Sequence, residues 1–336
     1  IRDRTLSAWA LIALLGGCTP LSEEGNSVLR GDEAFAAGDL EEALAEYRLA
    51  LRQGATDPGT YARAAHTFVA LRRVDEAREH YREAVAQDSS LADQAMADFV
   101  HLAREEAAAG DRYGMASAIQ TALEFRPGVS LGDLVLPLAQ HYSDAGEYGR
   151  ALPFFQKALS AMDPDSVPSV LFQTAVAYDE VGDCESAVIY YEDYRERTPR
   201  WLRSEVDWRL GHCSYELAQE RRADGDDEEA LRFLDTLLET GEPRNRQAGG
   251  YFLRGEILGL RGECEAAIEA FLQVPVMDPS GNSAVVDSAE MRIEQIRFGG
   301  RFDRIFQRLR TGDRSESCFP PESEIRFDRP IRGGRG

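Results

Sequence analysis

The residues best suited to chemistry in this chain are five cysteines and five histidines. Metal binding or catalysis by such residues needs close spacing, for example Cys-x-x-Cys or His-x-x-x-His. Neither spacing occurs, and the histidines are spread over positions 66, 80, 101, 141 and 212. The phosphate-binding pattern G-x-x-x-x-G-K-[ST] is absent as well. The sequence therefore predicts no enzymatic activity, no metal site and no cofactor.

The first cysteine follows a short apolar run. Two arginines precede an apolar stretch over residues 6–15, and Leu15-Gly16-Gly17-Cys18 comes next. Ten residues are too few to cross a bilayer core of about 30 Å as a helix, but they suit a secretory signal. The order of these features resembles the signal and lipobox of bacterial lipoproteins. That resemblance implies a signal peptide over 1–17, a palmitate-bearing lipid on Cys18 and a lipidated tether over 18–26.

The residue after the cysteine bears on location. It is Thr19, and resemblance to lipoproteins that lack an aspartate there implies an outer-membrane anchor facing the periplasm. The alternative is a buried apolar helix that contains a cysteine, in a cytosolic adaptor whose signal is not processed.

The overall charge limits the class of partner. The chain of 336 residues has 59 acidic and 38 basic residues, for a formal net charge of −21. This balance argues against nucleic-acid binding, which needs a basic face. It also argues against contact along an anionic lipid surface, so membrane attachment would depend on the lipid at Cys18.

A glycine followed by an acidic residue recurs along the chain. Two successive intervals are 36 residues each, from 110 to 146 and from 146 to 182. The copies are Gly38-Asp39, Gly110-Asp111, Gly146-Glu147, Gly182-Asp183, Gly225-Asp226 and Gly262-Glu263. A further copy fits at Arg72-Arg73, where the glycine has been lost. The recurrence predicts an internal structural repeat.

Each repeated position has a physical role. Glycine ends a helix in the left-handed conformation, and the following acid favours the start of the next helix. An alanine lies five residues after the glycine, except at Met115, and a bulky residue lies four further on, so both share one helical face. A proline then marks the turn into the next repeat. The pattern predicts two antiparallel helices per repeat, stacked one pair on another.

This pattern resembles the tetratricopeptide repeat (TPR) family. Gly146, Ala151, Phe155, Ala158 and Pro164 match the second half of its motif. The resemblance implies an all-α fold, an α-solenoid of about seven to eight repeats over 27–311 that ends in capping helices. The sixth repeat has about seven extra residues, which predict a lengthened helix and loop. An irregular, arginine-tipped tail follows over 312–336, either solvated or in contact with an acidic surface.

In TPR proteins the first helix of each pair lines a concave groove that binds protein partners. We therefore expect a peptide or helix to bind there. The matching positions are Phe35, His66, Arg104, Gln140, Phe172, Asp179, Trp208, His212, Tyr215, Phe252 and Glu256. Aromatic residues gather in the later repeats, which suits an anchoring patch. The alternative is that some of these rings pack between repeats instead.

The four cysteines after Cys18 form an even set, as in exported proteins with disulfides. Cys184 and Cys264 share a repeat position at the start of a second helix, and Cys213 lies in the first helix of the next repeat. The repeat geometry predicts Cys184–Cys213 and Cys264–Cys318 bridges. The alternative is four unpaired thiols.

Together these features favour a lipid-anchored TPR scaffold that helps to assemble an envelope complex. It resembles both the pilotin-type lipoproteins of type IV pili and the repeat lipoproteins of outer-membrane protein assembly. A peptidoglycan or glycan binder that acts on cell-wall synthesis is the alternative, because aromatic grooves also stack on sugars. Whether the solenoid forms a homo-oligomer stays open.

Overall fold

The fold was analysed in a computed structural model that describes residues 23–163, 167–279, 283–298 and 317–319. These ranges contain helices and turns but no strand. None of their helices is both long and apolar enough to cross a membrane. The predicted signal peptide, Cys18, the last part of the predicted capping helices (299–311) and most of the predicted tail lie outside the described residues.

The α-helices are α1 (Glu23–Ala37), α2 (Leu40–Gln53), α3 (Pro58–Ala70), α4 (Val74–Gln87), α5 (Ala92–Ala109), α6 (Arg112–Phe125), α7 (Val135–Asp144), α8 (Tyr148–Leu159), α9 (Val167–Glu180), α10 (Cys184–Arg197), α11 (Ser204–Ala223), α12 (Asp227–Thr240), α13 (Arg244–Leu260), α14 (Cys264–Met277) and α15 (Ala284–Phe298). Three short 3-10 helices join them: η1 (Ser89–Leu91), η2 (Gly132–Leu134) and η3 (Arg200–Leu202).

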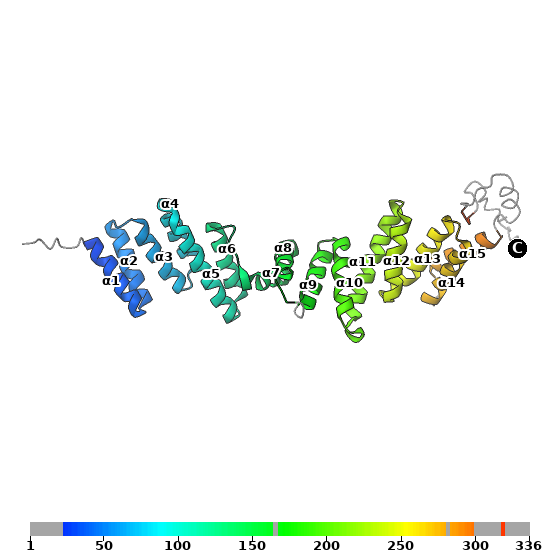
Figure 1. The fold of residues 1–336 in the computed structure, drawn as a ribbon, viewed down its shortest axis with the longest axis horizontal. Helices are drawn as coiled ribbons and strands as arrows, with labels where there is room; N and C mark the ends of the chain where they lie inside the picture. The colour runs from blue at the N-terminus through cyan, green and yellow to red at the C-terminus, as the bar shows by residue number, and fades with distance from the viewer. Residues whose placement is uncertain (1–22, 164–166, 280–282, 299–316, 320–336) are drawn as a thin grey trace, which may run out of the picture. The chain divides into compact units, whose positions relative to one another are not determined.

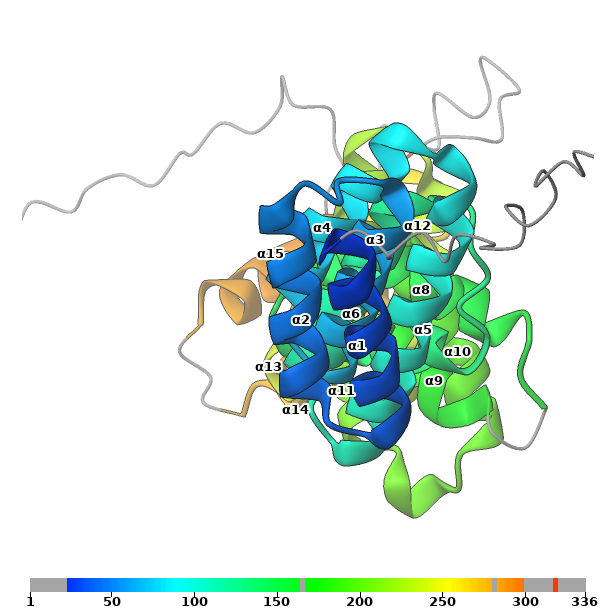
Figure 2. The same cartoon turned by 90° about the vertical axis from the view of Figure 1, so that its left-hand side faces the viewer.

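The helices belong to two compact units, Ile1–His141 and Tyr142–Gly336, and each is described by itself. In the first unit α1 packs on α2, α3 on α4 and α5 on α6 (Figures 1 and 2). In the second unit α9 packs on α10, α11 on α12 and α13 on α14. Each unit is thus a succession of two-helix repeats, as the sequence predicts.

The turns inside the pairs confirm the role given to glycine. The glycines of all six glycine–acid steps have φ between 73° and 85°, the left-handed region that a Cβ disfavours. The turn between α3 and α4 has no glycine, and Arg72 adopts φ 60° there instead. The backbone therefore keeps the same turn at the position where the sequence has lost the glycine.

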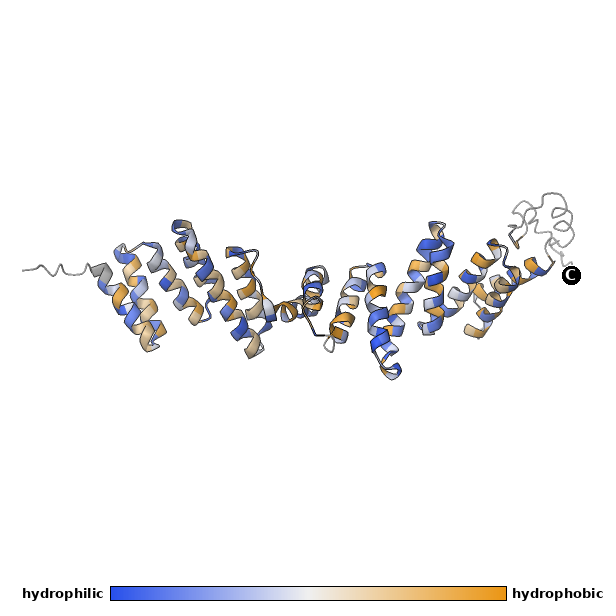
Figure 3. Ribbon diagram, in the orientation of Figure 1, coloured by the Kyte–Doolittle hydropathy of each residue, from blue (hydrophilic) through white to orange (hydrophobic). Residues whose placement is uncertain are grey.

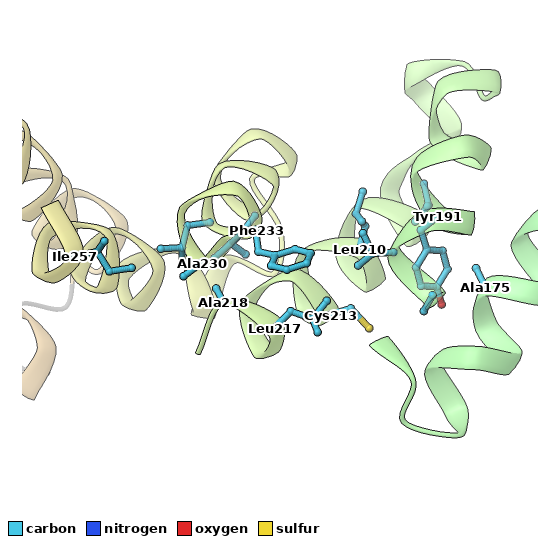
Figure 4. Close-up of a cluster of buried hydrophobic side chains, with 14 residues drawn as sticks. Ala175, Tyr191, Leu210, Cys213, Leu217, Ala218, Ala230, Phe233 and Ile257 are labelled. Carbon is cyan, nitrogen blue, oxygen red and sulfur yellow. The ribbon is translucent and has the colours of Figure 1, made fainter. Parts of the chain in front are cut away.

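The core of each repeat is the predicted alanine and aromatic face. In the second unit, Figure 4 shows Tyr191, Leu210, Cys213 and Phe233 within one buried cluster. Small residues on the first helices let the rings approach: a Cβ on Gly255 would lie 2.6 Å from the ring of Phe271. Each helix also carries hydrophilic residues (Figure 3), so its apolar side packs inward.

One helix boundary differs in detail from the expectation and another agrees with it. Helix α1 begins at Glu23, so residues 23–26 of the predicted tether are helical. The extra residues of the sixth repeat extend α11 to 20 residues, which is the lengthened helix that was predicted.

Candidate functional site: a face of the first helices

The predicted groove residues all lie on the first helices of the pairs. We call the side of these helices that carries them the first-helix face. In the first unit it includes Phe35 (α1), His66 (α3), Arg104 (α5) and Gln140 (α7). In the second unit it includes Phe172 and Asp179 (α9), Trp208, His212 and Tyr215 (α11), and Phe252 and Glu256 (α13).

His66 is held between neighbouring repeats rather than left free. Its ring lies 5.2 Å from the ring of Phe35, and its Nδ1 lies 2.6 Å from Oδ2 of Asp98 on α5. The buried Tyr81 donates its hydroxyl hydrogen bond to the same oxygen. The hydrogen bond to Asp98 raises the pKa of His66 above its usual value. His66 therefore joins three successive first helices.

The same arrangement recurs one repeat earlier. Asp32 accepts hydrogen bonds from the Tyr47 hydroxyl at 2.7 Å and from Arg63 Nε at 3.0 Å. Burial, with Asp32 beside the hydroxyl, raises the pKa of Tyr47 well above its usual value. Further along, Arg104 pairs with Asp133 at 3.2 Å. Charged groups on this face thus link one repeat to the next.

Asp179 makes contacts in the second unit similar to those of Asp32. It accepts from the Tyr191 hydroxyl and from Arg209 Nη1, both at 3.1 Å. Burial raises the pKa of Tyr191 well above its usual value. Glu256 is likewise paired, with Arg292 of α15 at 2.6 Å. The contacts made by Asp179 and Glu256 are therefore internal, and they explain these residues without a bound partner.

Two of the predicted aromatic residues are packing residues. The ring of Phe172 lies 6.0 Å from Tyr191 and 5.0 Å from Tyr194 of α10. The ring of Phe252 lies 5.6 Å from the buried Phe271. Both side chains are half-buried, and the rings that they contact lie on the second helix of the same pair, so these two residues pack within a repeat rather than between repeats.

Helix α11 presents the exposed part of the aromatic patch. Trp208 is 48% exposed and stacks on His212, with ring centroids 5.5 Å apart and planes 18° apart. Tyr215 continues the same stripe but lies under the guanidinium of Arg246, 4.9 Å from its ring centroid. Trp208 and His212 therefore form a flat aromatic surface that borders solvent.

The four cysteines of the described residues lie in two close pairs. The sulfur atoms are 2.24 Å apart in Cys184–Cys213 and 2.04 Å apart in Cys264–Cys318. In the described part of the chain, Asp179 and the first of these pairs also form a group close enough to hold a metal ion. A disulfide would use both thiolates, so this group suits a bridge better than a metal site.

One stretch of the chain matches a catalytic sequence pattern. Residues 128–132 read Gly-Val-Ser-Leu-Gly, which fits the G-x-S-x-G pattern of nucleophile elbows. That pattern needs a strand before the serine and a helix after it. Here Ser130 lies in the loop between α6 and η2, and the described residues include no strand. The string therefore lacks the structural context of an elbow.

The paired helices, glycine turns and alanine–aromatic packing make this protein an α-solenoid of the TPR type. No protein-family model and no curated protein sequence matches the chain. Among solved structures, MamA is similar at 19% identity and TM-score 0.31, over 52% of this chain and 90% of MamA. PilF of Pseudomonas aeruginosa is similar at 14% identity and TM-score 0.28, over 80% of this chain and 96% of PilF. PilW, a type IV pilus biogenesis factor, is similar at 15% identity and TM-score 0.27, over 80% of this chain and 98% of PilW. Likeness at this level concerns the fold and says nothing of a partner.

Proposed function

We propose that this protein is a scaffold that binds a peptide or helix of a protein partner on its first-helix face. The Trp208–His212 stack carries the proposal. Large aromatic side chains are enriched among the residues that contribute most to binding energy, and exposing one costs hydrophobic free energy unless a partner covers it. The charged residues of this face are largely paired internally, so the aromatic surface on α11 is the part left for recognition.

The binding mode follows from the shape of the stack. Trp208 and His212 are four residues apart on one helix, so their rings follow its axis and suit an apolar stripe on a partner segment. Tyr215 lies one turn further on, where its ring is already fixed by Arg246. A fixed aromatic neighbour lowers the entropy that binding would cost.

We further propose that the scaffold is anchored in an outer membrane by a lipid on Cys18 and acts in the periplasm. The lipobox-like sequence, the acidic composition and the two cysteine pairs support this location. There it would assist the assembly of an envelope complex, as a pilotin-like factor for type IV pili or in outer-membrane protein assembly.

Removing the exposed tryptophan tests the binding role. Trp208→Ala should abolish recovery of the partner by crosslinking and purification from cells of the native host. Trp201→Ala is the matched control, because Trp201 is 82% exposed but lies on η3, outside the first-helix face. Equal recovery with both variants, each with a native helical spectrum, would contradict the proposal.

The anchor is tested separately. Cells are labelled with a palmitate analogue, and the wild-type chain is compared with Cys18→Ser. We expect label in the outer-membrane fraction only with the wild type. A soluble, unlabelled wild-type protein would favour the cytosolic adaptor.

The near-parallel rings also favour a second candidate, glycan binding, because sugar rings stack on flat aromatic surfaces. Binding to purified peptidoglycan that is lost in Trp208→Ala would support this function. Binding that Trp208→Ala leaves unchanged would argue against a role for this face in it.

A further inference from the structure

Residues 317–319, which we call the strap, lie against the end of the second unit (Figure 1). Cys318 is fully buried, and its sulfur is paired with that of Cys264 at the start of α14. Its backbone N–H donates a hydrogen bond of 2.8 Å to the carbonyl oxygen of Gly259, near the end of α13. The strap is thus fixed to the solenoid by its backbone as well as by a side chain.

The next residue of the strap fills a site shaped for an aromatic ring. A Cβ on Gly259 would overlap the ring of Phe319 and lie 2.7 Å from its Cε2. On another side, the guanidinium carbon of Arg292 lies 4.5 Å from the ring centroid, a cation–π contact. Glu256 holds Arg292 in place: Arg292 Nη2 donates a hydrogen bond of 2.9 Å to Oε2 of Glu256, and its Nε forms an ion pair with Oε1 at 2.6 Å. The site is therefore bounded by Gly259, which leaves room for the ring, and by the guanidinium of Arg292.

This site lies on the first-helix face. Phe252, Glu256 and Gly259 are spaced by four and three residues along α13, so they share one side of that helix. The cation comes from α15, the helix that follows α14 in the chain. The strap thus occupies the last part of the face on which the sequence predicts partner binding.

We infer that this site is a receptor for an aromatic side chain in an extended partner segment, and that the strap is its built-in occupant. The inference rests on the proposed binding role of the first-helix face and gives it a second contact point. The partner is defined by the strap itself: a phenylalanine preceded by a residue whose backbone N–H reaches the Gly259 carbonyl. While the Cys264–Cys318 bridge is closed, the strap excludes that segment.

Opening the bridge would release the site. A dithiol reductant does this by exchange: its two thiols become a disulfide, and two electrons and two protons pass to the sulfurs of Cys264 and Cys318. A partner segment then competes directly for the Gly259 hydrogen bond and for the ring contacts that the strap makes in the described part of the chain.

The test uses a fluorescent peptide with the sequence of residues 314–322 and serine at the cysteine position. We expect no change in its anisotropy with the oxidised wild-type chain. The strap-released variant Cys264→Ser/Cys318→Ser/Phe319→Ala should bind it, and a peptide with alanine at the phenylalanine position should bind at least tenfold more weakly. Adding Gly259→Val to the released variant places a side chain where the phenylalanine ring would lie, so binding of the peptide should be abolished.

A folded strap-released variant that binds neither peptide, or both equally, would overturn the inference. If that variant unfolds, Phe319→Ala with the bridge intact, which vacates only the position of the ring, is titrated with N-acetylphenylalanine amide in place of the peptide; saturable binding that is lost on adding Gly259→Val supports the inference, and no binding overturns it. Trp208→Ala added to the released variant should leave peptide binding unchanged, because Trp208 lies on another helix. Peptide binding without Trp208-dependent partner recovery would contradict the α11 proposal alone, and the reverse result would contradict only this inference.

Discussion

At Arg72 the backbone conformation and the ion pair of the side chain have opposite effects on the stability of the first unit. It holds a left-handed turn that glycine holds in the equivalent turns, with φ 60°. This conformation costs an L-residue about 1–2 kcal/mol, whereas glycine loses about 0.5–1 kcal/mol more chain entropy on folding. On backbone grounds alone, Arg72→Gly would stabilise the first unit by about 0.5–1 kcal/mol.

The side chain of Arg72 works in the opposite direction. Its Nη1 lies 2.8 Å from Oε2 of Glu106, whose side chain is only 8% exposed. Leaving a buried charge without its partner costs about 3–5 kcal/mol, but Arg72 itself is 51% exposed, so we discount the loss to about 2 kcal/mol. The net expectation for Arg72→Gly is a destabilisation of about 1 kcal/mol.

A double-mutant cycle with Glu106 separates the two effects, because the effect of Arg72→Gly on stability should change sign when the ion pair is absent. In a Glu106→Gln background the buried charge is gone, so Arg72→Gly should stabilise by about 0.5–1 kcal/mol. Urea unfolding followed by far-UV circular dichroism measures all four proteins. Tryptophan fluorescence is an internal control, because the tryptophans after the predicted signal peptide, Trp201 and Trp208, lie in the second unit. Stabilisation of the wild type by Arg72→Gly, or equal destabilisation in both backgrounds, would refute the reasoning.

Three further predictions follow from the packing and the charges. Because Asp98 raises the pKa of His66 in the folded state, the stabilisation that this shift provides is complete below about pH 6.5, the usual value in an unfolded chain. It is lost as the pH rises through the folded-state pKa, so the urea midpoint of the first unit should fall over this range, and less so in His66→Gln. In thermal melts, Gly255→Ala should destabilise the protein by about 1–3 kcal/mol because the new Cβ meets the ring of Phe271. Gly149→Ala is the control: the space around Gly149 is open, so this substitution should stabilise the protein by up to about 1 kcal/mol. A thiol reagent should label none of the four cysteines after Cys18 in the denatured, unreduced protein and all four after reduction; label before reduction would show that a bridge is missing.

The fold was predictable because its signals are local. A glycine–acid step fixes a turn, and an alanine four residues before a ring fixes the packing face, so the helix pairs follow from short stretches of sequence. Even the turn without a glycine was placed correctly at Arg72, because the spacing of its neighbours left room for one more repeat. The proximity of the cysteine pairs followed from the same register.

The site was harder to predict because its contacts join residues about 30 positions apart. The registers alone did not show that His66 faces Asp98 or that Asp179 accepts a hydrogen bond from Arg209. The rings of Phe172 and Trp208 occupy similar positions on the first helices, yet neighbouring tyrosines cover the first and leave the second exposed. The Phe319 site depends on a segment outside the repeats, for which no periodic signal exists.

The central claim, that a protein partner binds the first-helix face at α11, is tested most directly by site-specific photocrosslinking in cells of the native host. A photoreactive residue is placed at Trp208, at His212, and at Ile189 as a control; Ile189 is 64% exposed but lies on α10, the second helix of its pair. We predict one discrete crosslinked partner from positions 208 and 212 and none from 189. Crosslinks from 189 alone, or the same products from all three positions, would contradict the claim.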